Sequence, residues 1–294
     1  MAHINRTSPI KRRSRSEVAS IKAWLYDTLA EKNPMTVRQV FYQGVSSGVI
    51  AKTETEYKQT ICRLLTDMRK AGELPWRWLA DNTRWMRKPR TEIGLAAMLD
   101  RTAETYRRAL WEQQPAYVEI WLEKDALAGV LYEETESWDV PLMVTRGYSS
   151  HTFLASAAET IREVGKPVYL YYFGDYDPSG VHIPQVIERQ LRDMAAGAEI
   201  HFKRVAVNPS QITAWNLPTR PTKKTDSRAK SFKGESVEVD AIPPKTLRAL
   251  AHNSIVRHID EAIYQRTLDI EKLERETLVK VAGWFHPDEE EAPA

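Results

Sequence analysis

The sequence predicts a mixed α/β protein in which an all-helical amino-terminal part precedes a parallel α/β sheet domain. In the first 72 residues, apolar side chains recur at helical spacing in three segments. From Tyr117 onward, strand-like and helix-like segments alternate, which is typical of consecutive β-α-β units and a parallel sheet. The charge also changes sign: residues 1–110 contain 21 Lys and Arg against 11 Asp and Glu, and the remainder contains 21 against 29. A basic part favours a polyanion and an acidic part offers carboxylates to metals, with ordinary charge variation as the alternative.

Composition places the chain among ordinary folded proteins. Its 294 residues are 42% hydrophobic and 28% charged, enough for two domains with their own cores. Cys62 is the single cysteine, so no internal disulfide forms, and no His or Cys cluster has zinc-ligand spacing. The basic start is not followed by the apolar segment of a signal peptide, and no apolar run reaches 18 residues. We expect a cytoplasmic, nucleoid-associated protein without membrane contact.

We expect four regions along the chain. Residues 1–15 form a basic flexible arm, residues 16–110 a helical domain, residues 111–286 a sheet domain with a carboxy-terminal elaboration, and residues 287–294 an acidic tail.

The helical domain begins with a helix over residues 16–32, which Ser16 is expected to cap. Thr36 caps a second helix over 37–47, and a third helix over 53–72 stops at Gly72. The Trp-rich stretch at 75–85 is interpreted as a short hairpin. Three helices with a small wing resemble a winged helix-turn-helix, a common DNA-binding shape.

The second helix carries a tyrosine and an arginine four residues apart. We expect Tyr42 to point outward from the buried face, with Arg38 on the same outward side. The alternative is a tyrosine packed at the domain edge and covered by the arginine. The expected buried face is formed by Val37, Val40, Phe41 and Val45.

The sheet domain is expected to place its ligand site at the carboxyl ends of its strands. Three features fall there: Glu123 after the first strand, Gly147 after the second, and Asp175 with Asp177 after the third. The expected strands are 117–122, 140–145, 167–173 and 200–207, with helices at 125–134, 150–164 and 184–195.

Asp175 and Asp177 are separated by one residue. On a continuing strand their charges would therefore lie on the same side, about 6 to 7 Å apart. Such a pair needs a proton or a cation, or else the chain turns and Asp177 caps the helix that follows. For Glu123, the alternative is a solvated pair with Lys124. The three carboxylates at neighbouring strand ends together favour a cation, and oxygen ligands of this kind suit Mg²⁺.

The order Glu, Gly, Asp-x-Asp at successive strand ends resembles the Toprim domain, a Rossmann-like fold. TVRQVFY followed by WLEKDA, RGYSS and GDYDPSG is similar to the topoisomerase VI A subunit and the related meiotic double-strand-break protein, especially the short orphan Mini-A forms. The resemblance covers roughly residues 35 to 210, and VEVDAIPPKTLRAL extends it to about 260. A winged-helix domain followed by a Toprim domain is what it implies.

The resemblance also implies roles for particular residues. Tyr42 matches the nucleophile that becomes linked to a DNA 5′ end, and Arg38 the arginine before it. Glu123, Asp175 and Asp177 match the magnesium ligands. The family's first of two adjacent tyrosines is Phe41 here.

The implied activity is Mg²⁺-dependent cleavage of double-stranded DNA by a homodimer. A positive charge near Tyr42 would stabilise its phenolate. The family's topoisomerases need an ATP-hydrolysing partner subunit, and the chain shows no nucleotide motif, so strand passage by this chain alone is not expected. The alternatives are a Toprim nuclease that activates water, and a DNA-binding regulator without catalysis. The basic stretch 217–236 is either a DNA-facing loop or a solvated excursion.

Overall fold

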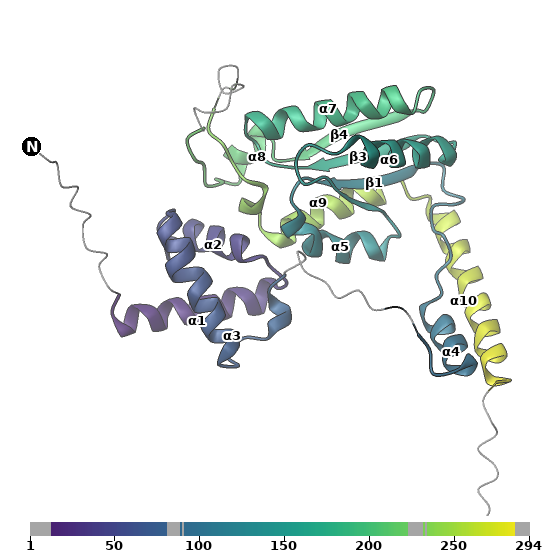
Figure 1. Ribbon diagram of the computed structural model, residues 1–294, viewed down its shortest axis with the longest axis horizontal. Helices are drawn as coiled ribbons and strands as arrows, with labels where there is room; N and C mark the ends of the chain where they lie inside the picture. The colour runs from purple at the N-terminus through teal and green to yellow at the C-terminus, as the bar shows by residue number, and fades with distance from the viewer. Residues whose placement is uncertain (1–12, 81–88, 90, 223–231, 233, 286–294) are drawn as a thin grey trace, which may run out of the picture. The chain divides into compact units, whose positions relative to one another are not determined.

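The computed structural model describes residues 13–80, 89, 91–222, 232 and 234–285, and divides into two compact units (Figure 1). One unit ends at Ala80 and also contains Asp240–Lys245. The other contains the described residues of 81–239 and those from Thr246 onward. The expected boundary near residue 110 differs from this division because α4 (Leu95–Thr105) belongs with the sheet unit, where it packs against α10 (Glu261–Gly283).

The helical unit begins with two helices that carry capping boxes. α1 (Arg15–Lys32) starts one residue before the expected helix, and its cap is Ser14 rather than Ser16. α2 (Val37–Ser46) is capped by Thr36, as predicted: the Thr36 hydroxyl accepts from the backbone of Gln39, whose side chain accepts from the Thr36 backbone. These reciprocal bonds satisfy amide groups that a helix start otherwise leaves without partners.

The third predicted helix consists of two parts. A π-helical segment, η1 (Glu56–Cys62), continues into α3 (Arg63–Lys70), and Gly72 follows with a φ of 74°. The buried stripe of this helix is Ile61, Leu64, Leu65 and Met68.

The hairpin prediction is wrong for the first part of the Trp-rich stretch. Trp76–Trp78 forms a single 3₁₀ turn, η2, and Leu79 forms a parallel bridge with Met35. Residues 81–85 lie outside the described residues. The winged-helix interpretation therefore stays a prediction.

Residues 1–12 of the expected basic arm and the whole acidic tail lie outside the described residues, whereas Arg13, Ser14 and Arg15 are described, the last two as the cap and first residue of α1. The guanidinium of Arg13 donates to Glu56 at 2.8 and 2.9 Å and to the Thr60 hydroxyl at 2.7 Å. This residue is therefore anchored to η1 and does not belong to a flexible arm.

The predicted parallel sheet is confirmed. Its four strands run parallel in the order β2-β1-β3-β4. They are β1 (Tyr117–Leu122), β2 (Leu142–Val144), β3 (Val168–Phe173) and β4 (Ile200–Ala206). The helices of the β-α-β units are α5 (Ala128–Ser137, after the 3₁₀ turn η3, Asp125–Leu127), α6 (His151–Val164) and α7 (Pro178–Met194).

The sheet is covered by helices on both faces (Figure 1). On one face, α6 and α7 pack on Trp121, Leu170 and Tyr172 in one hydrophobic cluster. On the opposite face lie α5 and α9 (Pro244–Val256), and His258, just after α9, accepts or donates a hydrogen bond with Tyr171 at 2.7 Å. Burial on both faces explains why the strand sequences read as nearly continuous apolar runs.

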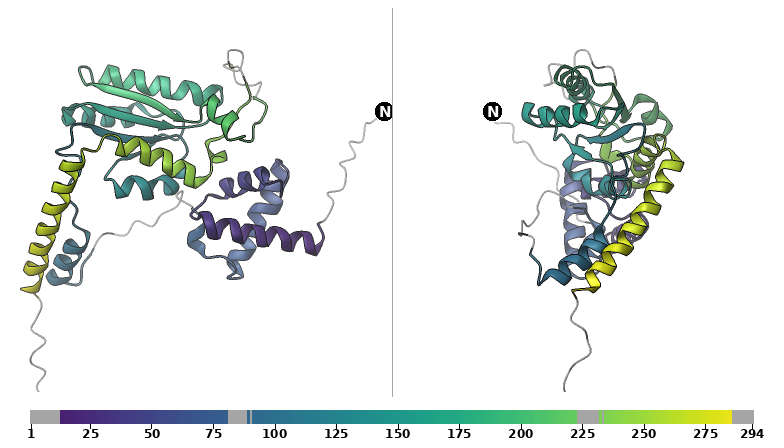
Figure 2. Two further views of the ribbon diagram at one scale, coloured as in Figure 1. Left: turned by 180° about the vertical axis from the view of Figure 1, so that it is seen from behind. Right: turned by 90° about the vertical axis from the view of Figure 1, so that its right-hand side faces the viewer.

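Beyond the sheet, α4 lies beside α10 in both views of Figure 2. The Tyr106 hydroxyl donates to Glu274 at 2.7 Å, and the Arg275 guanidinium donates to the Tyr106 carbonyl. A short helix, α8 (Pro209–Ala214), and a 3₁₀ turn, η5 (Val239–Ala241), complete the described elements with defined bounds.

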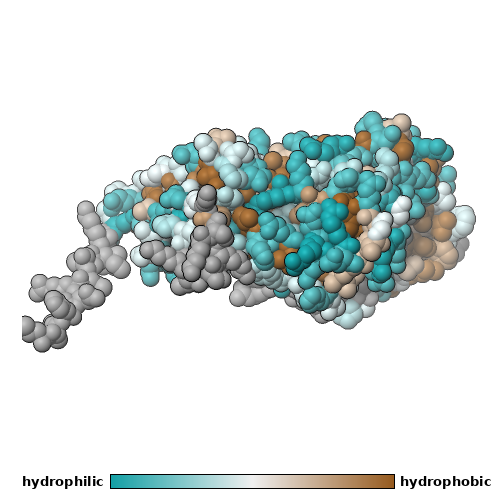
Figure 3. All heavy atoms as spheres, turned by 90° about the horizontal axis from the view of Figure 1, so that it is seen from above, coloured by the Kyte–Doolittle hydropathy of each residue, from teal (hydrophilic) through white to brown (hydrophobic). Residues whose placement is uncertain are grey.

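Hydrophilic side chains predominate on the face seen in Figure 3, and apolar side chains form separate patches there. Within the described ranges, we find no helix whose length and apolar character would allow it to cross a membrane.

Candidate metal centre

Two neighbouring strands bring the first two predicted ligands together. β1 and β3 pair in register so that Leu122 lies opposite Phe173, and both strands end at these residues. Glu123 and Gly174 therefore leave the same edge of the sheet. The backbone amide of Asp175 donates to Oε2 of Glu123 at 3.0 Å, so the Glu123 carboxylate lies directly against the loop that carries the aspartates.

Two glycines make this close approach possible. A Cβ atom at Gly174 would lie 2.4 Å from Oε2 of Glu123, and one at Gly180 would lie 2.2 Å from the carbonyl oxygen of Asp175. Both distances are far below van der Waals contact. A side chain at Gly180 would displace the backbone of Asp175, and one at Gly174 would push away the Glu123 carboxylate and the Tyr172 ring, which explains both glycines of the GDYDPSG sequence by their surroundings.

Asp177 caps α7, which starts at Pro178 and not at the expected residue 184. Its Oδ1 accepts from the backbone amide of Gly180 at 2.7 Å. β3 ends at Phe173, two residues before Asp175, so the two aspartates do not continue a strand, and the same-side geometry of a continuing strand does not apply. The helix-cap alternative is correct for Asp177.

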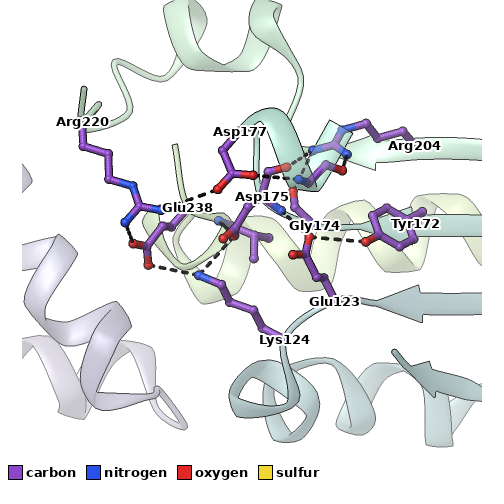
Figure 4. Close-up of polar contacts among 11 residues, drawn as sticks. Glu123, Lys124, Tyr172, Gly174, Asp175, Asp177, Arg204, Arg220 and Glu238 are labelled. Atoms are coloured by element: carbon purple, nitrogen blue, oxygen red, sulfur yellow. Dashed lines mark hydrogen bonds and ion pairs between the residues drawn. The ribbon is translucent and has the colours of Figure 1, made fainter. Parts of the chain in front are cut away.

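The Lys124 ammonium pairs with Asp175 and also with a fourth carboxylate, that of Glu238 (Figure 4). The ammonium nitrogen of Lys124 lies 3.1 Å from Oδ1 of Asp175 and 3.0 Å from Oε2 of Glu238. Oδ1 of Asp175 also accepts from the backbone amide of Val239 at 2.8 Å. Arg220 pairs with Glu238 at 2.8 Å and stands 3.7 Å from Oδ2 of Asp177.

Glu238 lies at the site because the residues just before it pair with the loop after β3 and with the segment around Arg220. Val237 forms an antiparallel bridge with Tyr176, between the two aspartates, and Ser236 forms one with Arg220. Sequence reasoning missed Glu238 and did not single out Arg220. The sequence offers one signal for Glu238, the acidic, strand-like VEVD at residues 237–240 that follows the basic stretch. Nothing in those four residues specifies that they pair with residue 176.

Arg204 of β4 supports the backbone of the same loop. Its guanidinium donates to the carbonyl oxygens of Gly174, Asp175 and Gly180, the last at 2.8 Å. Burial lowers the pKa of Arg204 from its ordinary value. These hydrogen bonds from one guanidinium to three backbone carbonyl groups fix the conformation of the loop at the end of β3.

Burial and a neighbouring negative charge make Glu123 a weaker acid than an ordinary glutamate, so it holds its proton more tightly. Burial, and next the Asp175 carboxylate, raise the pKa of Glu123 to about 7. The Tyr172 hydroxyl donates to the same carboxylate at 3.3 Å, and burial raises the pKa of this tyrosine as well. Asp175, Asp177 and Glu238 thus share the cations Lys124 and Arg220, and the Lys124 charge partly offsets the raised pKa of Glu123.

The donor set suits a divalent cation, although it is not arranged as a finished cage. Carboxylate oxygens are the ligands Mg²⁺ prefers, and an ammonium already stands between two of them. Among the described residues, no three His, Cys, Asp or Glu side chains stand in a metal-holding arrangement. Glu123, Asp175 and Asp177 therefore share one sheet edge, where Lys124 pairs with Asp175 and Asp177 caps α7, and their joint binding of a cation stays a prediction.

Gly147, the remaining strand-end feature, has a φ of 88° in the loop after β2. This left-handed conformation accounts for the glycine without a ligand.

In the helical unit, the expected outward position of Tyr42 is wrong. Its side chain is 3% exposed. The chain after α2 folds back, with the amide of Ile50 donating to the Gly44 carbonyl, and Lys52 comes to 5.5 Å from the Tyr42 ring centre. The guanidinium of Arg38 stacks 4.2 Å from the ring centre of Tyr57. The edge-packed alternative describes Tyr42 better, with Lys52 over its ring.

In comparisons with known proteins, no protein-family model matches the chain, and no curated protein matches it in sequence. The resemblance to the topoisomerase VI A subunit therefore depends on the quoted motifs alone.

Proposed function

We propose that the protein cleaves double-stranded DNA in a Mg²⁺-dependent reaction at the sheet edge that carries Glu123, Asp175 and Asp177. The observation that carries the proposal is the meeting of these carboxylates at the ends of β1 and β3, where Glu123 lies against the Asp175 amide. Carboxylates buried this closely raise one another's cost of ionisation unless a cation compensates them.

The residues of the chain have distinct roles in this proposal. Asp175 and Glu123 would hold Mg²⁺, and Asp177 adds negative charge while it fixes the start of α7. When bound, Mg²⁺ would neutralise charge on the scissile phosphate. Glu123 must lose its proton to serve as a ligand, so the site is expected to gain metal affinity as pH rises through about 7.

The leading reaction is transesterification by Tyr42. Its phenolic oxygen forms a bond to phosphorus, the bond from phosphorus to the 3′ oxygen breaks, and the phenolic proton leaves to solvent while the 3′ oxygen gains one. The product is protein joined to a 5′ phosphate. Positive charge in this unit comes from Lys52, whose ammonium lies 5.5 Å from the centre of the Tyr42 ring, and from Arg38, which lies on α2 with Tyr42.

A second reaction is favoured by one observation: the 3% exposure of Tyr42. In this candidate, the oxygen of a water at the carboxylate edge would bond to phosphorus while the bond from phosphorus to the 3′ oxygen breaks. The 3′ oxygen gains a proton, both DNA ends are free, and Tyr42 is structural.

Supercoiled plasmid, incubated with the protein and MgCl₂ and quenched with detergent, separates these reactions. Transesterification predicts linear or nicked DNA that enters a gel only after protease treatment, and loss of cleavage in Tyr42→Phe. Tyr26→Phe, a matched change at an exposed tyrosine of α1, keeps activity.

Free ends with an active Tyr42→Phe variant would select hydrolysis instead. Both reactions require loss of cleavage in Glu123→Gln, whereas Asp193→Asn, an exposed acid in the last turn of α7, retains it. Specific DNA binding without cleavage in any divalent metal would refute both and leave a DNA-binding regulator. The homodimer and an ATPase partner remain expectations of the resemblance.

A further inference from the structure

We propose that Glu238 belongs to the metal-binding site and that the ammonium of Lys124 marks the position at which Asp175 and Glu238 share a divalent cation. Lys124 and the metal then compete for one place. This inference rests on the proposed function, because it identifies a further ligand and a built-in competitor at the same site.

The first argument is geometric. One nitrogen atom lies 3.1 Å from a carboxylate oxygen of Asp175 and 3.0 Å from one of Glu238, so a single cation position already serves both acids (Figure 4). Oxygen atoms contact Mg²⁺ at about 2.0 to 2.1 Å. Each carboxylate needs to move by about 1 Å to exchange the ammonium for the metal.

The second argument concerns what holds the two acids in place. Asp175 is fixed by the amide of Val239, and Glu238 is fixed on its other oxygen by Arg220 at 2.8 Å. The side chains of Asp175 and Glu238 are only 10% and 11% exposed. These contacts limit how far the two carboxylates move when Lys124 leaves, and their burial favours a replacement cation.

The third argument concerns Lys124 itself. Its side chain is 25% exposed, and it follows Glu123 at the mouth of the sheet edge. A four-carbon stem lets an ammonium swing toward solvent, whereas the backbone around Asp175 is held by Arg204. The lysine is thus the movable partner of this cluster.

Mn²⁺ binding to the full chain tests the inference without any cleavage assay. The unbound ion is counted by its electron paramagnetic resonance signal at pH 7.5, and Mg²⁺ is added in competition. Removing the charge of a carboxylate ligand, in Glu238→Gln, is expected to weaken binding by about tenfold or more. Removing the competing ammonium, in Lys124→Met, is expected to tighten binding by about tenfold.

Matched controls lie on exposed positions. Glu235→Gln changes a neighbouring acid, and Lys272→Met changes a lysine on α10, and both are expected to bind Mn²⁺ like the wild type. Because loss of folding cannot tighten binding, the Lys124→Met result is informative even if Glu238→Gln is destabilised.

Opposite shifts in the two variants support the inference. Wild-type binding that neither variant changes, or weaker binding by Lys124→Met, overturns it and leaves the proposed function standing. Absence of Mn²⁺ binding in both the wild type and Lys124→Met would overturn the inference and the metal-dependent function together.

Discussion

Glu119 provides a direct measure of how strongly the sheet core disfavours charge. It lies on β1, is 1% exposed, and accepts a hydrogen bond from the indole of Trp121 at 2.7 Å. Burial raises its pKa from 4.5 to about 7, against the lowering effect of the Trp121 bond. The folded protein therefore binds this proton more tightly than the unfolded chain does.

The sign of the pH dependence follows from linkage. A carboxyl group whose pKa is raised on folding contributes its full stability below about pH 4.5, and this contribution is lost as pH rises to about 7. The loss amounts to about 3 kcal/mol in the free energy of unfolding. Glu119→Gln removes the titration while keeping an oxygen that can accept from Trp121.

The assay is urea unfolding of the wild type and Glu119→Gln between pH 4 and 8. Circular dichroism gives the free energy, and hydrogen exchange of peptides covering β1 identifies the transition of the sheet unit. The variant is expected to gain about 3 kcal/mol relative to the wild type between pH 4.5 and 7. Glu159→Gln, an exposed change on α6, shows no such trend. A difference between Glu119→Gln and the wild type that stays constant over this range would refute the argument from burial.

Three further predictions concern other parts of the sheet unit. Gly174→Ala places a methyl group 2.4 Å from the Glu123 carboxylate and is expected to cost about 1 to 3 kcal/mol in urea unfolding, whereas Gly283→Ala, with open space around it, is not. Asp177→Ala is expected to lose about 1 kcal/mol with the helix cap, and Asp177→Asn to keep the cap; equal losses would contradict the capping role. Burial lowers the pKa of His258 to about 4, so its imidazole is expected to titrate near pH 4 by NMR, and its contribution to stability is lost as pH falls from 6.5 toward 4. A midpoint near 6.5 would contradict that burial.

The sheet was predictable because its strands are short, apolar and regularly separated by helical patterns. YVEIWL matched β1 residue for residue, and the helix over 150–164 differs from α6 by one residue at its start. Parallel strands buried on both faces leave this pattern in any sequence that forms them. The carboxyl-edge rule then placed Glu123 near Asp175 without any coordinates.

The exposure of Tyr42 was not predictable from helical periodicity. The apolar stripe of α2 suggested one buried face that includes Val40 and Phe41, but Gln39, Tyr42 and Gly44 are buried too. The reason lies outside the helix, because the return of the chain through Ile50 and Lys52 covers a second side. Periodicity reports which side chains prefer burial, and it does not report what the following loop covers.

The sequence by itself determined the order and type of the main elements, the parallel sheet, and the edge at which the acidic residues gather. Only the tertiary structure decided their partners: Lys124 between Asp175 and Glu238, and Arg220 on Glu238. The physical reason is the separation along the chain over which each kind of interaction acts. Periodicity and turn chemistry act between residues close in the chain, whereas the contact between Lys124 and Glu238 joins residues 114 positions apart, through bridges that no local pattern specifies.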